Sequence, residues 1–265
     1  MKLPFLLSIP HGGTKIPDEL RKFSILSDKD LFLDGDAYTI DIYNLKSKVM
    51  EIIKTDTARA FVDVSREVFK MPPEFKDGVI KSHTCYNKKI YKNDLPNELI
   101  ELILNKYYHP YQDKLTELCQ DENIILGFDC HSMAEIGPDI AKDAFQSRPL
   151  INLGDNEGKS ANPEFTKLLK KSFIEVFSFD ESEVTINKPF KGGFITRNYG
   201  NNPIPFIQIE MNRSLYLNQM WFDFDKLKMH NLSRLKYLNT MFEMVLRRFY
   251  DYLKKNNRLK REIRA

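Results

Sequence analysis

Aspartate, histidine and serine side chains follow a short apolar run near the middle of the sequence. The run 124–126 leads through Gly127 and Phe128 into Asp129, His131 and Ser132. Short apolar runs bounded by polar residues are typical of buried strands. Ligands of open α/β sheets bind in the crevice outside the carboxyl ends of strands. We therefore expect this strand to deliver Asp129 and His131 to such a crevice.

A second apolar run ends in the same way. Residues 5–9 are followed by Pro10, His11 and two glycines, and glycine lets the backbone approach a ligand closely. Two buried strands that each end in a histidine predict a metal site. The alternative is that His11 and His131 are separately satisfied polar residues at strand ends.

Carboxylates that could complete this site lie at Asp34 and Asp36. Catalytic zinc is held by three protein ligands drawn from His, Asp and Glu, with water in the fourth place. His11, His131 and one of the two aspartates supply that set, which implies one Zn²⁺ ion. The alternative for Asp34 and Asp36 is capping of a following helix, and the residues alone leave the choice between them open.

Asp129 lies two residues before His131, on the same face of the predicted strand. Carboxylates commonly accept the second N–H of a metal-bound imidazole. We therefore expect Asp129 to orient His131 from behind the metal site.

A further carboxylate, Glu210, lies in a segment that alternates apolar and polar residues. Residues 205–212 read as a strand with one wet face, which carries Gln208, Glu210 and Asn212. We predict that Glu210 is the general base, which takes a proton from zinc-bound water and passes it to the leaving nitrogen.

Three arginines lie in strand-end or glycine-rich segments, namely Arg66, Arg148 and Arg197. The planar guanidinium group matches a carboxylate with two parallel hydrogen bonds. The alternative for each arginine is a surface ion pair. Together they predict a small anionic substrate.

The elements that position these residues follow from apolar periodicity and turn signals. We predict strands at 5–10, 58–64, 124–126, 148–155, 184–187 and 205–212. We predict helices at 40–53, at 95–121 with a kink at Pro110, at 163–177 with Asn162 as its cap, and from 224 to about 252. Residues 68–93 are expected to form a long loop, and residues 190–200 a substrate-facing loop.

Composition describes an ordinary globular chain of 265 residues, 42% hydrophobic and 29% charged, with a net charge of +3. No linker or repeat divides it, so we predict a single domain over 1–265. The small charge gives no argument for nucleic acid as a partner. A basic tail from about 254 is expected to be solvated, the alternative being a nucleic-acid contact.

Three cysteines without CxxC spacing argue against a disulfide scaffold or a cysteine zinc site and favour a reducing compartment. The sequence shows no signal segment and no run of about 20 apolar residues. We therefore expect a cytoplasmic protein without a membrane partner. The oligomeric state is not predicted.

Taken together, the motifs resemble the N-formylglutamate amidohydrolase family, zinc enzymes related in fold to metallocarboxypeptidases. The resemblance rests on segments 8–13, 34–36, 63–66, 129–132, 152–154, 191–200 and 208–210. It implies a zinc-carboxypeptidase-like α/β fold with a mixed, largely parallel central sheet flanked by helices.

The resemblance also implies hydrolysis of a small N-acyl amino acid, in the best-known case N-formyl-L-glutamate to formate and glutamate. It implies His11, Asp36 and His131 as metal ligands and Glu210 as base and polariser. Arg66 would bind the substrate α-carboxylate, and Arg197 would be a further anion contact. Rival hypotheses are carboxypeptidase-like hydrolysis of short peptides and a non-catalytic amino-acid-binding protein. Retention of Glu210 argues against the latter, because binding alone has no use for a general base.

Overall fold

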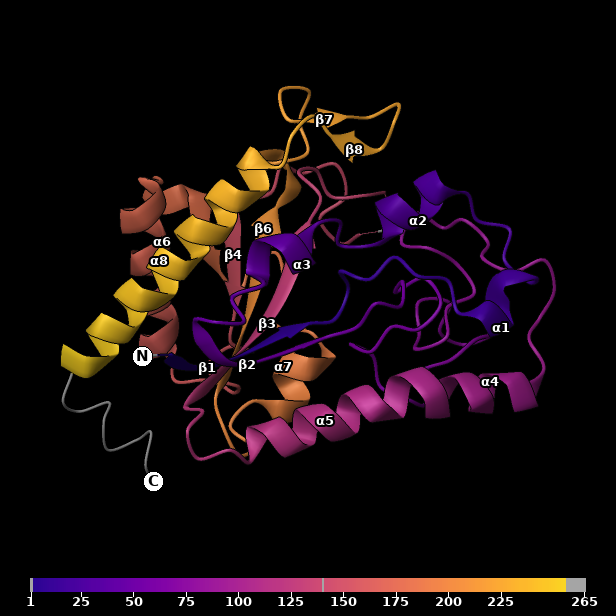
Figure 1. Cartoon of the computed structure of the whole chain (residues 1–265), viewed down its shortest axis with the longest axis horizontal. Coiled ribbons are helices and arrows are strands. Elements are labelled where there is room, and N and C mark those ends of the chain that lie inside the picture. Colours follow the sequence, from indigo (N-terminus) through magenta and orange to yellow (C-terminus); the bar gives the residue numbers. More distant parts are fainter. Residues whose placement is uncertain (1, 140, 256–265) are drawn as a thin grey trace.

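A computed structural model describes residues 2–139 and 141–255, and a twisted six-stranded sheet runs through its centre (Figure 1). The strand order is β2-β1-β3-β6-β4-β5. Strands β1, β2, β3 and β6 are parallel, whereas β4 pairs antiparallel with β6 and parallel with β5. The strands are β1 (Leu3–Ile9), β2 (Val49–Lys54), β3 (Leu126–Met133), β4 (Ile151–Gly154), β5 (Val184–Ile186) and β6 (Phe206–Asn212). The predicted mixed, largely parallel sheet is confirmed.

Helices cover both faces of this sheet (Figure 1). One face carries α3, α6 and α8, with α3 and α6 each contacting α8, and the other carries α5 and α7. The helices are α1 (Asp18–Arg21), α2 (Asp28–Asp34), α3 (Thr39–Tyr43), α4 (Asn97–Ile103), α5 (His109–Cys119), α6 (Pro163–Phe177), α7 (Phe194–Tyr199) and α8 (Ser233–Lys255). Short turns of other helix types span Leu104–Tyr108, Glu181–Glu183 and Arg213–Leu215, and a small hairpin pairs β7 (Phe222–Asp223) with β8 (Lys228–Met229).

Aromatic rings fill the layer between the sheet and α8. Phe5 of β1 lies with its ring centroid 5.2 Å from that of Phe128 and 5.8 Å from that of Phe249. Phe242 makes an edge-to-face contact with Tyr43 at 4.8 Å. These rings are fully buried, so the layer excludes water from behind the strands that carry the predicted site.

Several predicted elements are confirmed. Helix α6 begins at Pro163 with the Asn162 side chain accepting the Glu164 N–H, and β5 is an edge strand. The predicted helix 95–121 is present as α4, a π-helical turn and α5, with Pro110 in the first turn of α5. Residues 68–93 contain no helix or strand, as expected for a long loop.

The predicted helix 40–53 is wrong beyond Tyr43. Helix α3 ends there, and β2 pairs in parallel with β1, opposite residues that include Leu7 and Ser8. The apolar residues of this stretch satisfy a helical spacing, but Val49, Ile52 and Ile53 are β-branched and favour strands. Pairing with β1 decides between the two readings, and periodicity alone does not contain that information.

The predicted strand 58–64 is also wrong, although the segment is buried. Its backbone forms turns, in which the Phe61 and Val62 N–H groups both donate to Ala58 O, and Asp63 N donates to Val79 O. Local turns and one long-range bond therefore satisfy the backbone polar groups that a strand would have paired.

Two further predictions need correction, and a third concerns residues that the structure does not describe. Helix α8 starts at Ser233 rather than 224, because the β7–β8 hairpin occupies the preceding residues. Residues 194–199 of the predicted substrate-facing loop form α7. Lys254 and Lys255 end α8, and the rest of the predicted basic tail lies outside the described residues. Within the described part of the chain, no helix combines the length and apolarity needed to cross a membrane.

Packing of α8 against the sheet yields a stability prediction. Phe242→Ala should lower the free energy of unfolding by about 3–5 kcal/mol, the usual cost of deleting a buried phenylalanine ring. Met244→Ala on the same helix is the control, because Met244 is 48% exposed. Urea unfolding followed by circular dichroism measures both variants, and equal losses would contradict this description of the core.

Candidate metal centre

Two parallel strands bring the predicted site residues together at the carboxyl end of the sheet. His11 follows β1 by two residues, and His131 lies within the last three residues of β3. Strand β6 places Glu210 directly opposite His131 in the parallel register of β3 and β6. Both histidines and Glu210 are buried. The predicted meeting of the two histidines is thus confirmed in geometry.

Three atoms converge at the centre of this cluster. His11 Nδ1 lies 3.0 Å from His131 Nδ1, and Asp36 Oδ2 lies 3.6 Å and 3.3 Å from these two nitrogens. A tetrahedral zinc ion with bonds of about 2.0–2.1 Å has its ligand atoms about 3.3 Å apart. The spacing of the three atoms therefore fits one small divalent ion.

The second nitrogen of each imidazole faces a buried aspartate. His11 Nε2 hydrogen-bonds to Asp63 Oδ1 at 2.7 Å, and His131 Nε2 lies 3.0 Å from Asp129 Oδ1. A proton held on each Nε2 leaves the Nδ1 lone pairs pointing at each other and at the Asp36 carboxylate. Three electron-pair donors at this separation repel unless a proton or a metal ion lies between them, so the donor set fits a metal.

Asp36 is fixed by donors on its outer side. Ser132 N donates to Oδ2 at 3.1 Å, and Arg213 Nη2 donates to Oδ1 at 3.0 Å. Burial opposes ionisation of Asp36, but side-chain hydrogen bonds with His11 and His131, followed by the charges of His11 and Arg213, hold its pKa well below the usual value. The carboxylate is therefore ionised and oriented with Oδ2 toward the histidines.

The geometry separates Asp34 from Asp36. Asp34 ends α2 and accepts a hydrogen bond from Cys85 N at 2.6 Å, and its other oxygen lies 3.8 Å from Lys81 Nζ. It therefore faces a cationic cluster and not the two histidines. The alternative of helix capping is not seen for either residue, since neither caps α3 with its side chain.

Glu210 lies beside the two histidines on β6. The face of β6 that carries it is buried, so the predicted wet face is wrong. Gln208, Glu210 and Asn212 are all buried, because β6 lies between β3 and β4. Gln208 Nε2 donates to Glu210 Oε1 at 2.7 Å. Burial raises the pKa of Glu210 to about 7, with Asp36 and Asp129 adding to the rise and His131 limiting it.

A pocket of about 620 Å³ opens above these residues. Its lining includes the three converging ligand residues, Glu210 and all three predicted substrate-binding arginines. It further includes the charged residues Asp34, Arg59, Asp77, Lys142, Lys191 and Arg213, and the aromatic residues Tyr86 and Phe190.

The three arginines differ in how they are engaged. Arg148 donates two hydrogen bonds to Asp143, at 2.6 and 2.8 Å, and stacks over the Phe190 ring. Arg66 donates to Asp77 Oδ2 at 2.7 Å. Arg197 is 45% exposed and donates to a backbone carbonyl oxygen, that of Gly192. The alternative of ion pairing applies to all three, because Arg197 Nη2 also lies 4.0 Å from Glu67 Oε1, although all three line the pocket.

Sequence reasoning missed several charged side chains around the site. Asp63 behind His11, Arg213 behind Asp36, and the buried pair Arg59 and Lys81 had no predicted role. Asp63 and Arg213 directly follow an apolar run and a strand, respectively, the same signal that identified His131. Lys81 is fully buried in an irregular segment, and no local pattern identifies such a lysine.

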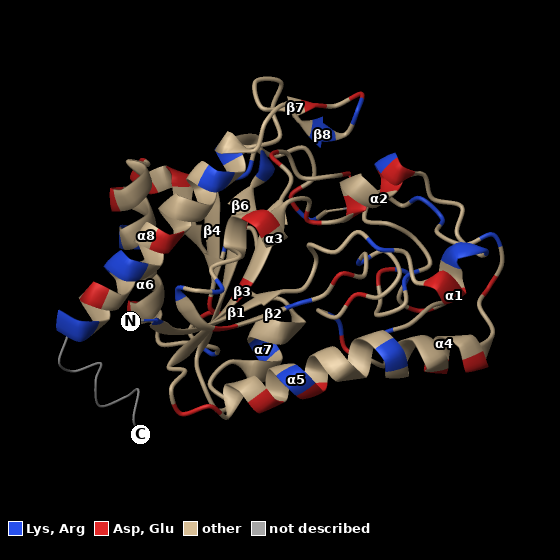
Figure 2. Ribbon diagram, viewed as in Figure 1, with Lys and Arg blue, Asp and Glu red and all other residues tan. Residues whose placement is uncertain are grey.

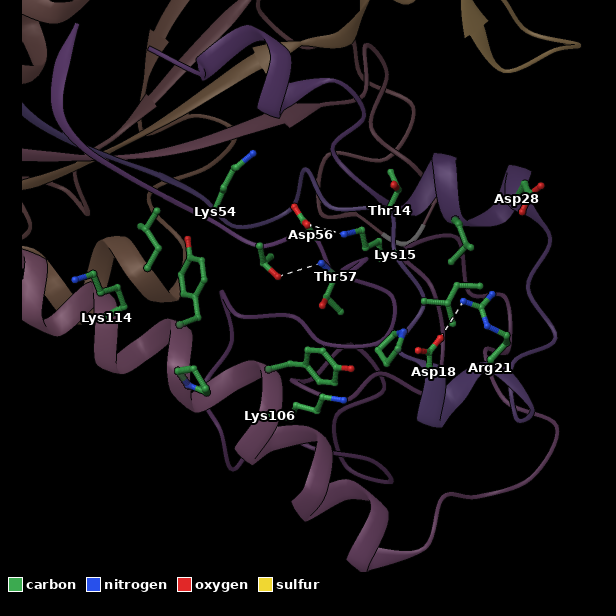
Figure 3. A pocket seen from close by; sticks show the side chains of 18 residues that line it. Thr14, Lys15, Asp18, Arg21, Asp28, Lys54, Asp56, Thr57, Lys106 and Lys114 are labelled. Atoms are coloured by element: carbon green, nitrogen blue, oxygen red, sulfur yellow. Dashed lines mark hydrogen bonds and ion pairs between the residues drawn. The ribbon is translucent and has the colours of Figure 1, made fainter. Parts of the chain in front are cut away.

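A larger hollow, of about 930 Å³, lies elsewhere, between α1, the segment after β2 and α5, and it contains none of the predicted site residues (Figure 3). Four of its charged side chains pair with one another, Lys15 with Asp56 at 2.8 Å and Arg21 with Asp18 at 3.3 Å. Helices α5 and α8 likewise carry residues of both signs (Figure 2). The pocket above the histidines is therefore the better candidate for chemistry.

The aspartate behind His131 yields a prediction about metal affinity. Asp129→Asn should weaken zinc binding about 10–100-fold, the usual cost of losing an outer carboxylate partner of a metal-bound histidine. Competition with a chromophoric chelator measures the affinity. Asp121→Asn is the control, because Asp121 contacts only the exposed Asn123 through its side chain. Equal zinc affinity of the wild type and Asp129→Asn would remove this role.

Comparisons with known proteins agree with the predicted family. A family model described as N-formylglutamate amidohydrolase matches residues 3–217, and this span contains every residue of the candidate site. A protein named N-formylglutamate deformylase from Pseudomonas putida is 24% identical over 239 residues, covering 82% of this chain and 83% of that protein. A protein of the same name from Pseudomonas aeruginosa is 23% identical over 230 residues, covering 82% and 84%.

The fold agrees as well. The crystal structure of N-formylglutamate amidohydrolase from Ralstonia eutropha JMP134 superimposes with a TM-score of 0.78 and 19% identity, covering 96% of this chain and 95% of that one. The structure of a gene product from Agrobacterium tumefaciens has a TM-score of 0.66 at 14% identity, covering 95% and 91%. The predicted resemblance and the enzyme class that it implies are confirmed: this chain belongs to the N-formylglutamate amidohydrolase family.

Proposed function

We propose that this protein hydrolyses the amide bond of a small N-acyl amino acid, with N-formyl-L-glutamate as the first candidate, and uses one zinc ion. The observation that carries the proposal is the convergence of His11 Nδ1, His131 Nδ1 and Asp36 Oδ2 within 3.6 Å of one another, in the pocket that Glu210 lines. Family membership and the names of the two Pseudomonas relatives support the substrate class.

His11, Asp36 and His131 would hold the ion. Two imidazole nitrogens and one carboxylate oxygen form a donor set that suits zinc, and three protein ligands leave a position open, as in catalytic sites. When bound, the ion would supply acidified water and polarisation of the amide carbonyl. Asp63 and Asp129 keep the protons of the two histidines on Nε2, so that both Nδ1 atoms remain available.

Glu210 would act as the general base and then as the acid. Its carboxylate would take a proton from the attacking water and deliver it to the amide nitrogen, so that the amine leaves in its neutral form. The hydrogen bond from Gln208 Nε2 holds Oε1 in place. A buried carboxyl with a pKa near 7 is well matched to exchanging a proton at neutral pH.

The arginines would recognise the carboxylates of the substrate. Arg66 lines the pocket and lies 3.8 Å from Asp63, the partner of His11, and we assign it the α-carboxylate. Arg197 has the freest guanidinium of the three and would meet a second anion. Arg148, which is held by Asp143 and stacked on Phe190, would shape the wall of the pocket and contribute positive charge.

The test of the proposal is a substrate panel. Zinc-loaded protein is incubated with formyl-, acetyl- and succinyl-amino acids and with short peptides, and released amine is assayed. We expect the highest kcat/KM with a formylated acidic amino acid. Preference for peptides would replace the proposal with a carboxypeptidase-like activity, and binding without turnover of any compound would favour the non-catalytic hypothesis.

Removal of the base yields the next prediction. Glu210→Gln should lower kcat at least about 100-fold, because general acid–base catalysis contributes about 10²–10⁴-fold. Zinc content should be unchanged, since Glu210 is outside the three ligands, and metal analysis checks this point. Glu117→Gln, an exposed residue of α5, is the control. Undiminished turnover in Glu210→Gln would show that another group is the base.

Loss of the proposed carboxylate ligand should affect binding more than chemistry. Arg66→Met should raise KM for N-formyl-L-glutamate about tenfold or more, because a hydrogen bond to a charged group is worth about 1.5–3 kcal/mol. Arg21→Met is the matched control, since Arg21 is an exposed arginine paired with Asp18 outside the pocket. A KM equal to that of the wild type would remove Arg66 from substrate recognition.

A further inference from the structure

One aspartate of the pocket lining, Asp77, contacts three cations, Arg59, Arg66 and Lys81. The Asp77 carboxylate accepts from Arg66 Nη2 at 2.7 Å, lies 2.7 Å from Lys81 Nζ, and lies 3.9 Å from Arg59 Nη2. Arg66 Nε also donates to the backbone carbonyl oxygen of Asp77 at 3.1 Å. The Nη2 group of Arg66, which could donate to a substrate carboxylate, is therefore already engaged by a carboxylate of this chain, while Nη1 donates to the backbone carbonyl oxygen of Ser65.

The charges of this cluster balance only when a third carboxylate is present. Three cations, Arg59, Arg66 and Lys81, face two fully buried carboxylates, Asp34 and Asp63, at 3.4–3.9 Å. Arg59 also lies 4.0 Å from Asp36, whose nearer partners are the histidines and Arg213. Without Asp77 the cluster has one unpaired positive charge, and an unpaired buried charge is strongly unfavourable.

Asp77 differs from the other members in being open to solvent. Its side chain is 47% exposed, whereas those of Asp34, Asp63 and Lys81 are fully buried. It ends a run of exposed residues, 72–77, which belongs to the long loop 68–93. The buried residues that follow anchor this run, with Val79 N donating to Lys70 O at 2.9 Å. The Asp77 side chain can therefore leave the cluster for water without disturbing the core.

We propose that Asp77 occupies the substrate-carboxylate position in the free enzyme and exchanges with the substrate carboxylate on binding. The inference rests on the proposed function, in particular on Arg66 as the carboxylate ligand. The incoming carboxylate restores the charge balance that Asp77 maintains in the free enzyme. A neutral ligand leaves the cluster unbalanced if it displaces Asp77, so the exchange selects for anions. Return of Asp77 after hydrolysis promotes release of the amino-acid product.

The competing interpretation makes the opposite prediction. If Asp77 is a permanent hydrogen-bond partner that orients Arg66 toward the substrate, its removal weakens binding of the substrate. If Asp77 is an internal competitor, its removal strengthens binding. The sign of the change therefore decides between the two interpretations.

The experiment compares Asp77→Asn with Asp56→Asn, a control with the same change of charge. Asp56 is an exposed aspartate paired with a lysine at 2.8 Å outside this pocket. L-Glutamate binding to the zinc-loaded proteins is measured by calorimetry, and KM for N-formyl-L-glutamate by amine release. We expect Asp77→Asn to lower both Kd and KM at least about fivefold, about 1 kcal/mol. Asp56→Asn should leave both near wild-type values.

A double variant ties the effect to the guanidinium. In an Arg66→Met background, Asp77→Asn should no longer tighten binding, because the group for which the two carboxylates compete is absent. Asp77→Ser is the second variant, and thermal melting confirms that each protein is folded. Unchanged or raised Kd in both Asp77 variants overturns the inference. A wild type that binds glutamate but does not cleave the formyl compound overturns the proposed function, while the Kd comparison still decides the role of Asp77.

Discussion

The candidate site depends on the way two imidazoles are held from behind. Asp63 and Asp129, both fully buried, engage the Nε2 atoms of His11 and His131. That constraint leaves each histidine one free nitrogen and turns both free nitrogens toward Asp36. Parallel pairing of β1 with β3 sets Ser8 opposite Asp129, so the sheet brings the loop that carries His11 beside the strand that carries His131.

Asp63 also joins the metal site to the cationic end of the pocket. One of its oxygens accepts from His11, and the other lies 3.4 Å from Arg59 and 3.5 Å from Lys81. Burial opposes ionisation of Asp63, but the charges of Arg66, His11, Arg59 and Lys81 hold its pKa well below the usual value. Burying so many charges is costly unless they are paired. We propose that the chain accepts that cost because this part of the pocket binds a substrate carboxylate beside a metal ion.

The sequence was sufficient where local chemistry decides the structure. The cap and proline of α6, the alternation along β6 and the histidines after β1 and within β3 all carry their signals within a few residues. The sequence was insufficient where contacts with residues distant in the chain decide the local structure. Residues 49–54 form a strand rather than the predicted helix because they pair with β1. Residues 58–64 do not form the predicted strand, because turns satisfy their backbone hydrogen-bonding groups. Asp34 and Asp36 share one local context, and only the positions of Lys81 and His131 separate them.

The same argument explains why counting arginines predicts an anionic substrate but not how it is bound. Arg66, Arg148 and Arg197 are equivalent in sequence context, yet their accessible hydrogen-bonding capacity differs. Arg148 donates two hydrogen bonds to Asp143 and stacks its guanidinium plane over the Phe190 ring. The Arg197 side chain is 45% exposed and donates to the Gly192 carbonyl oxygen. Arg66 is intermediate, because its partner Asp77 is itself half exposed. Affinity for an anion is the difference between its contacts and those it replaces, so we expect binding of an anion here to depend on the internal partner of each arginine rather than on the number of arginines.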